Sequence, residues 1–111
     1  MAKLAVLDAR GTPDFPDRLR AIWEAGDAAL PVDPRLPAPS RAALLEAMGA
    51  GAPVDDGDAL VVATGGTTGA PKGVVLTHDA VAASAVLTSR ALGVDPGADR
   101  WLACLPLAHI G

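Results

Sequence analysis

Aromatic residues are scarce in this sequence, whose 111 residues include two tryptophans, one phenylalanine and no tyrosine. Half of the residues are nevertheless hydrophobic. Alanine, valine and leucine must therefore supply most of the buried surface in small increments. A chain of this length is the size of one modest domain with a core of limited extent.

Cysteine, basic residues and long apolar runs are also few. Cys104 is the single cysteine and lies in an apolar run, which predicts a buried structural thiol and a cytoplasmic location. The net charge of −4 argues against a nucleic-acid partner, because binding to a phosphate backbone needs clustered Lys and Arg. No apolar run approaches the ~20 residues of a membrane span. The apolar run at the N-terminus is too short for a signal peptide.

One stretch is rich in glycine and free of carboxylates. Residues 64–73 hold three threonines, four glycines and one lysine between two short apolar runs. Glycines let backbone N–H groups converge on phosphate oxygens, and the hydroxyls and the ammonium add further donors. The stretch predicts a phosphate-binding loop on a β-hairpin, with these candidate cofactor-binding residues: Thr64, Gly65, Gly66, Thr67, Thr68, Gly69, Lys72 and Gly73.

Two better-known nucleotide loops do not match this stretch. A Walker loop needs Gly-Lys followed by a hydroxyl residue, but Lys72 follows Pro71, and Gly73 stands where the hydroxyl should be. The dinucleotide fingerprint fails because its glycine spacing is wrong and no helix opens at the loop. A solvated hairpin tip without function remains the alternative interpretation.

The rest of the chain predicts an α/β fold in which strands alternate with helices. Pro31 should confine its strand to an edge or an end of the sheet, and residues 33–39 should be extended. Thr77 is a suitable N-cap for the last helix, and His78 is more typical of first-turn capping than of a phosphate or metal contact. We expect strands at 4–7, 28–32, 59–63, 74–76 and 101–105 (the last one buried), and helices at 16–25, 40–48 (with Leu44, Leu45 and Met48 inward) and 78–92.

The loop resembles the signature loop of the adenylate-forming superfamily, which includes acyl-CoA synthetases, adenylation domains of peptide synthetases and luciferases. The usual form is Thr-Ser-Gly-Thr-Thr-Gly-x-Pro-Lys-Gly-Val, and Gly65 stands at the serine. Residues 26–37 resemble the family stretch Gly-x-x-x-x-Pro-x-Asp-Pro-x-x-Pro. Residues 105–111 resemble Leu-Pro-Leu-x-His-x-x-Gly, broken off one residue early.

The resemblance implies that residues 1–111 are the N-terminal portion of an AMP-binding large domain, incomplete and without the small C-terminal domain. It implies ATP, Mg²⁺ and coenzyme A as cofactors and a small carboxylic acid as partner. His109 and Gly111 would line the acyl pocket. We expect no catalytic residue and no metal ligand within this chain, which alone should be inactive.

The implied activity of the intact protein is acyl-adenylate formation with pyrophosphate release, followed by transfer to coenzyme A. The interval ahead of the loop, residues 49–58, is short, which resembles the compact members of the superfamily. The short N-terminal lead resembles compact bacterial CoA ligases such as the o-succinylbenzoate–CoA ligase of menaquinone synthesis. A truncated, non-catalytic paralogue that binds nucleotide is the alternative from another functional class.

Overall fold

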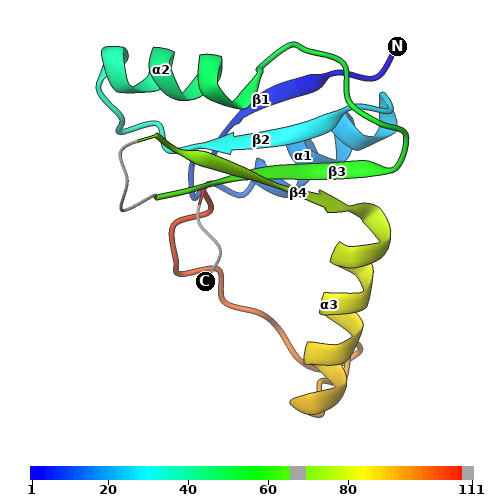
Figure 1. Cartoon of the computed structure of the whole chain (residues 1–111). Helices are drawn as coiled ribbons and strands as arrows, with labels where there is room; N and C mark the ends of the chain where they lie inside the picture. The colour runs from blue at the N-terminus through cyan, green and yellow to red at the C-terminus, as the bar shows by residue number, and fades with distance from the viewer. Residues whose placement is uncertain (66–69, 109–111) are drawn as a thin grey trace.

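A computed structural model describes residues 1–65 and 70–108 of the chain. Its centre is a four-stranded sheet in the order β1-β2-β3-β4, with three helices (Figure 1). The first three strands are parallel, and β4 is antiparallel to β3. The predicted α/β alternation and the hairpin are confirmed. The elements are β1 (Leu4–Asp8), α1 (Phe15–Glu24), β2 (Ala28–Val32), α2 (Ala38–Met48), β3 (Asp58–Thr64), β4 (Lys72–Thr77) and α3 (His78–Ala91).

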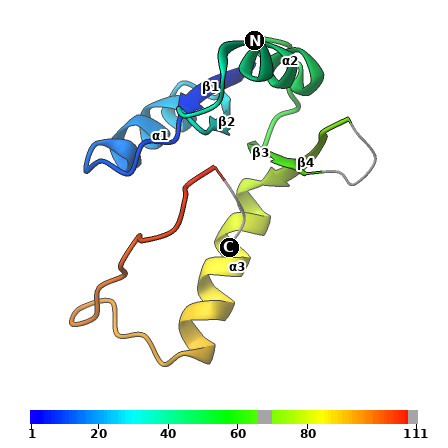
Figure 2. The same ribbon diagram turned by 90° about the vertical axis from the view of Figure 1, so that its left-hand side faces the viewer.

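The core lies between the sheet and α2. Strand β2 is buried along its whole length because strands flank it on both sides and helices cover both faces of the sheet. Leu44, Leu45 and Met48 of α2 pack against Leu30 and its neighbours, which confirms the inward face predicted from their spacing. Helix α1 packs against β1 and β2 from the other side of the sheet (Figures 1 and 2).

The connection after α2 reaches the outer edge of β1. Residues 51–54 run along the outer edge of β1, where Leu4 N–H donates to Ala52 O at 2.9 Å and Gly51 N–H donates to Leu4 O at 2.8 Å. The chain therefore passes from β2 over to the far edge of β1 before it returns to form β3 beside β2.

Two expectations concern prolines. The sequence placed Pro31 at an edge or an end of the sheet, and since β2 is an inner strand, only the second alternative holds. Pro31 does lie near its end, beyond the one register pair with β3, Ala29 and Leu60. The missing N–H therefore breaks no bond at the centre of the sheet. Residues 33–37 form a turn rather than an extended segment, and α2 begins at Ala38 with a proline in its first turn, where its absent N–H leaves no helical bond unmade.

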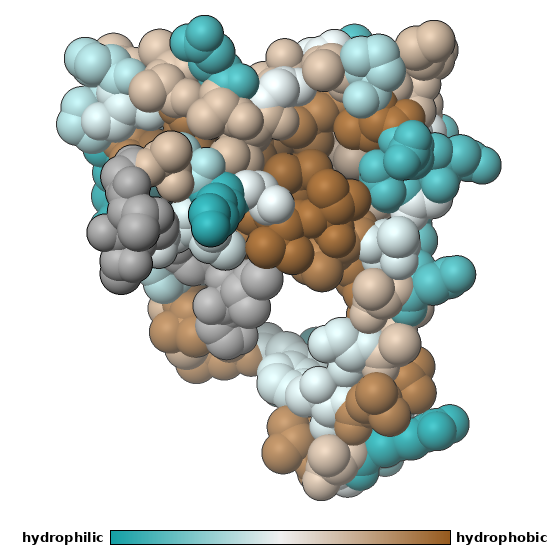
Figure 3. All heavy atoms as spheres, viewed as in Figure 1, coloured by the Kyte–Doolittle hydropathy of each residue, from teal (hydrophilic) through white to brown (hydrophobic). Residues whose placement is uncertain are grey.

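The C-terminal third projects from the sheet (Figure 2). Helix α3 has no buried residue, and apolar side chains are exposed over this part of the molecule (Figure 3). The prediction of a buried strand at 101–105 is wrong: the segment is irregular, Leu102 is 84% exposed, and Cys104 is exposed. An apolar run forms a strand only beside another strand that accepts its backbone hydrogen bonds, and none of the described strands lies beside this one.

The helices of the described residues are all too short or too polar to cross a membrane.

Candidate functional site

The predicted phosphate loop joins β3 to β4. These strands pair from Asp58 opposite Thr77 to Thr64 opposite Lys72, which is the last pair before the loop. The Thr64 hydroxyl donates to the main-chain oxygen of Lys72 at 3.2 Å. The hairpin thus brings two of the predicted site residues face to face at the end of the sheet, both exposed to solvent.

The Lys72 ammonium is available to an anion. Its side chain is exposed, and no carboxylate within residues 1–65 or 70–108 forms an ion pair with it. A lysine without a carboxylate partner has its three N–H donors free for a ligand.

The other loop residues are placed only in part. Among residues 1–65 and 70–108, no heavy atom lies within 4 Å of a Cβ atom built on Gly65, and the backbone there is not left-handed. A serine, the usual residue of the resembling loop, therefore fits at this position. The remaining predicted contacts lie outside the described residues: Gly66, Thr67, Thr68, Gly69, His109 and Gly111.

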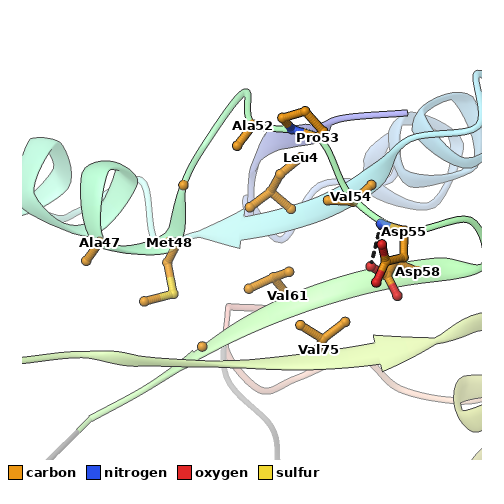
Figure 4. A pocket seen from close by; sticks show the side chains of 12 residues that line it. Leu4, Ala47, Met48, Ala52, Pro53, Val54, Asp55, Asp58, Val61 and Val75 are labelled. Atoms are coloured by element: carbon orange, nitrogen blue, oxygen red, sulfur yellow. Dashed lines mark hydrogen bonds between the residues drawn. The ribbon is translucent and has the colours of Figure 1, made fainter. Parts of the chain in front are cut away.

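Gly73 has a packing role that the sequence did not reveal. It lies in regular strand opposite Ala63, without a left-handed backbone. A Cβ atom there would come within 2.9 Å of Met48 Sδ and 3.2 Å of Val61 Cγ1. Figure 4 shows Met48 from α2 and Val61 from β3 on the same side of the hairpin. Glycine lets α2 pack closely on the strand that leaves the loop.

The hollow between α2 and the hairpin does not suit a phosphate. Its volume is about 390 Å³, and its walls include Met48, Val61 and Val75 (Figure 4). Its polar end carries two carboxylates, and Asp58 accepts a hydrogen bond from Asp55 N–H at 3.1 Å. Apolar walls with two negative charges would repel a polyanion.

The carboxyl ends of β1, β2 and β3 lie at the same end of the sheet, because these strands are parallel. Open α/β sheets bind their ligands at this end of the strands. Asp8 at the end of β1 pairs with Arg41 at 2.8 Å. Asp33 after β2 holds Arg35 through two bonds, Nε–Oδ1 at 3.1 Å and Nη2–Oδ2 at 3.0 Å, and this hydrogen bonding raises the pKa of Arg35.

Sequence reasoning missed these two ion pairs. The available signal was an aspartate at or just after the end of each of the first two predicted strands. Parallel topology, which the alternation with helices indicates, brings such residues to the same end of the sheet.

The opposite end of the hairpin is fixed by aromatic contacts. Trp23 Nε1 of α1 donates to Ala59 O at 2.9 Å. The His78 ring meets the Trp23 ring edge-on, with centroids 5.1 Å apart. Thr77 Oγ1 accepts from Ala80 N–H at 3.1 Å, which confirms the predicted N-cap, whereas His78 packs its ring on Trp23 in place of capping. Across the described ranges, no three His, Cys, Asp or Glu side chains are grouped to hold a metal ion.

Known proteins share both the sequence and the fold of this chain. The 2-succinylbenzoate–CoA ligases of Bacillus mycoides (strain KBAB4) and Bacillus anthracis (strain A0248) are each 51% identical to it over 51 residues, which is 46% of this chain and 10% of theirs. A solved structure of an E. coli MenE variant with bound OSB-AMS superimposes with a TM-score of 0.75 at 26% identity, over 97% of this chain and 30% of that one.

The chain thus spans about a tenth of the length of the curated relatives that it matches. The sequence pattern of a family described as AMP-binding enzyme matches residues 52–111. This region contains the hairpin, its loop and everything that follows, more than half of the chain, and the chain therefore belongs to the AMP-binding enzyme family.

Proposed function

We propose that the intact protein activates a carboxylic acid with Mg·ATP and transfers the acyl group to coenzyme A. The carboxylate attacks the α-phosphorus, pyrophosphate leaves, and the acyl-adenylate then reacts with the thiol. One observation carries the proposal: the hairpin holds Thr64 together with Lys72, which no described carboxylate pairs, at the start of a loop with the family pattern.

Among the described loop residues, Lys72 should stabilise the transition state most. Negative charge grows on the β- and γ-phosphates as the bond to the α-phosphorus breaks, and donors aimed at those oxygens stabilise the transition state by about 3–4 kcal/mol each in a closed site. The ammonium of Lys72 is ready for this role. The Thr64 hydroxyl already donates to Lys72 O, so its hydrogen must turn before it can bind a phosphate.

Magnesium is expected to arrive on the nucleotide. The stretch from residue 64 to residue 73 contains no carboxylate, and carboxylates are the protein ligands that Mg²⁺ prefers. Threonine hydroxyls and backbone N–H groups suit phosphate oxygens instead. The proposed role of the loop is therefore to hold the phosphates, while the metal ion neutralises part of their charge.

The place of this chain in the whole protein is part of the proposal. Residues 1–111 would form the N-terminal portion of the large domain, with the groups that bind adenine and ribose beyond it. His109 and Gly111 would line the acyl pocket, and the single cysteine favours a cytoplasmic protein.

A specific acid is favoured by the comparisons. Relatives named 2-succinylbenzoate–CoA ligase are 51% identical over the matched residues, so 2-succinylbenzoate is the first acid to test. A nucleotide-binding protein without chemistry is the competing candidate, and Gly65 in place of the usual serine favours it.

The test uses a chimera in which residues 52–111 replace the matching segment of the Bacillus mycoides ligase. We expect ATP–pyrophosphate exchange that depends on 2-succinylbenzoate, and a loss of at least a hundredfold in Lys72→Ala. Arg90→Ala, on the exposed face of α3, is the matched control and should keep full exchange. Equal exchange by Lys72→Ala and the control would refute the role of the loop, and nucleotide binding without exchange would support the competing candidate.

A further inference from the structure

The hollow between α2 and the hairpin carries negative charge at two of its ends. Figure 4 shows Asp55 and Asp58 together at one end and Met48, the last residue of α2, toward the other. The carbonyl end of a helix has a partial negative charge, and the last turn of α2 contains no basic residue. None of the described residues that line the hollow is a lysine or an arginine. Its interior therefore favours a cation.

The carboxylates of Asp55 and Asp58 are available to a ligand. Asp58 Oδ2 accepts from Asp55 N–H at 3.1 Å, and Asp58 N–H donates to Asp55 O at 3.2 Å, so a turn holds the two residues side by side. Neither carboxylate forms an ion pair with a basic side chain of residues 1–65 or 70–108. Asp58 is half-buried, which reduces the screening of its charge by salt. One ammonium group has three N–H donors and can bind both carboxylates.

The walls between the two ends are apolar. Leu4 and Val54 lie on one side, and Val61 and Val75 lie on the other (Figure 4). Met48 adds a thioether, which makes favourable contacts with aromatic rings. The volume of about 390 Å³ is at the lower end of the range of small-molecule sites. These walls suit a ligand with a compact apolar body.

A metal ion fits the hollow less well than an organic cation. Calcium takes roughly six to eight oxygen ligands, whereas the apolar side chains of the walls offer none. Among residues 1–65 and 70–108, no three His, Cys, Asp or Glu side chains are grouped to hold a metal ion.

We propose that the hollow binds a small primary amine in its ammonium form. The ammonium group lies between the carboxylates of Asp55 and Asp58, and the apolar body packs against Met48 and Val61. Neither Thr64 nor Lys72 lines the hollow, so this site is separate from the phosphate loop and does not depend on the proposed function.

The test is a titration of the ¹⁵N-labelled 111-residue chain with 2-phenylethylamine. Two matched ligands separate its parts: 2-phenylethanol has the same body without the charge, and methylamine has the charge without the body. We expect 2-phenylethylamine to shift the amide signals of Asp55, Asp58 and Val61 at concentrations at which the other two leave them unchanged.

Variants of the carboxylates test the recognition of the ammonium group. Asp58→Asn should weaken binding about tenfold, and Asp55→Asn should do the same. Asparagine at residue 58 keeps an oxygen that accepts from Asp55 N–H, so the turn should persist. Asp56→Asn, in the same turn but not among the residues that line the hollow, is the matched control and should bind normally.

Several results would overturn the proposal. Absence of shifts with 2-phenylethylamine would show that the hollow is not a site, and equal shifts with 2-phenylethanol would show that the charge is not recognised. Equal shifts with methylamine or calcium chloride would show that charge alone is sufficient. Equal affinities of Asp58→Asn and Asp56→Asn would remove the carboxylate from the site.

A lysine side chain of a partner protein is the other source of an ammonium group. Nα-acetyl-lysine methylamide should bind more weakly than 2-phenylethylamine, because its amide groups would lose water against apolar walls. Tighter binding of the lysine compound would assign the hollow to a partner protein and contradict the proposal of a free amine.

Discussion

Replacing Gly73 with alanine tests whether this glycine is needed for packing or for backbone freedom. The new Cβ would lie 2.9 Å from Met48 Sδ and 3.2 Å from Val61 Cγ1, and both distances are shorter than ordinary van der Waals contact. Gly73 has no left-handed φ, so alanine can adopt the backbone conformation without strain.

Two opposing effects set the expected magnitude. Alanine in a strand reduces the entropy of the unfolded chain and should stabilise the fold by about 0.5–1 kcal/mol. Overpacking against Met48 and Val61 should cost about 1–3 kcal/mol. We therefore expect Gly73→Ala to lower the free energy of unfolding by about 1 kcal/mol.

A double-mutant cycle with Met48→Ala isolates the packing contribution. Removing the thioether eliminates the closest contact, so in that background Gly73→Ala should stabilise by about 0.5 kcal/mol, a coupling of about 1.5 kcal/mol. The assay is urea unfolding of all four proteins followed by circular dichroism. Gly11→Ala is the control, because its Cβ meets no atom of the described residues within 4 Å and its φ is not left-handed.

The reasoning would be refuted by a Gly73→Ala protein that is as destabilised in the Met48→Ala background as in the parent. That result would mean that the backbone at residue 73 needs glycine for a reason other than the contact with α2.

Three further predictions concern the ends of the hairpin. Trp23→Phe removes the donor to the buried carbonyl of Ala59 and should cost about 1–2 kcal/mol in urea unfolding; an unchanged midpoint would show that the bond contributes nothing. Thr77→Ala removes the cap that accepts from Ala80 N–H and should cost about 1 kcal/mol, whereas Thr77→Ser should restore stability, and equal losses in both would contradict the capping role. Gly65→Ser should leave stability within about 0.5 kcal/mol, because the site is open and such surface changes are small. By restoring a hydroxyl it should tighten Mg·ATP binding by about 1 kcal/mol in calorimetry, and weaker binding would count against the loop as a phosphate site.

The elements that periodicity defines were predictable from the sequence. The apolar spacing of Leu44, Leu45 and Met48 placed one face of α2 against the core, and Thr77 marked the start of α3. Local signals of this kind depend on a few neighbouring residues, so they can be interpreted without knowledge of the whole fold.

Features that depend on distant partners were not predictable. Residues 101–105 have the composition of a buried strand but lie exposed, because no described strand pairs with them. The contact of Gly73 with Met48 and the pair of Asp8 with Arg41 join segments far apart in the sequence. The loop was recognised because its pattern of glycines and hydroxyls is local.

The most direct test of the central claim is a titration of this chain with Mg·ATP. Lys3 and Lys72 are the two lysines of the chain, and both are exposed, so each serves as the control for the other. Lysine Nζ signals followed by NMR should shift at Lys72 alone, inorganic pyrophosphate should compete, and Lys72→Ala should weaken binding at least tenfold while Lys3→Ala binds normally. Equal responses of the two lysines, or unchanged affinity in Lys72→Ala, would contradict the claim that the hairpin holds the phosphates of a nucleotide.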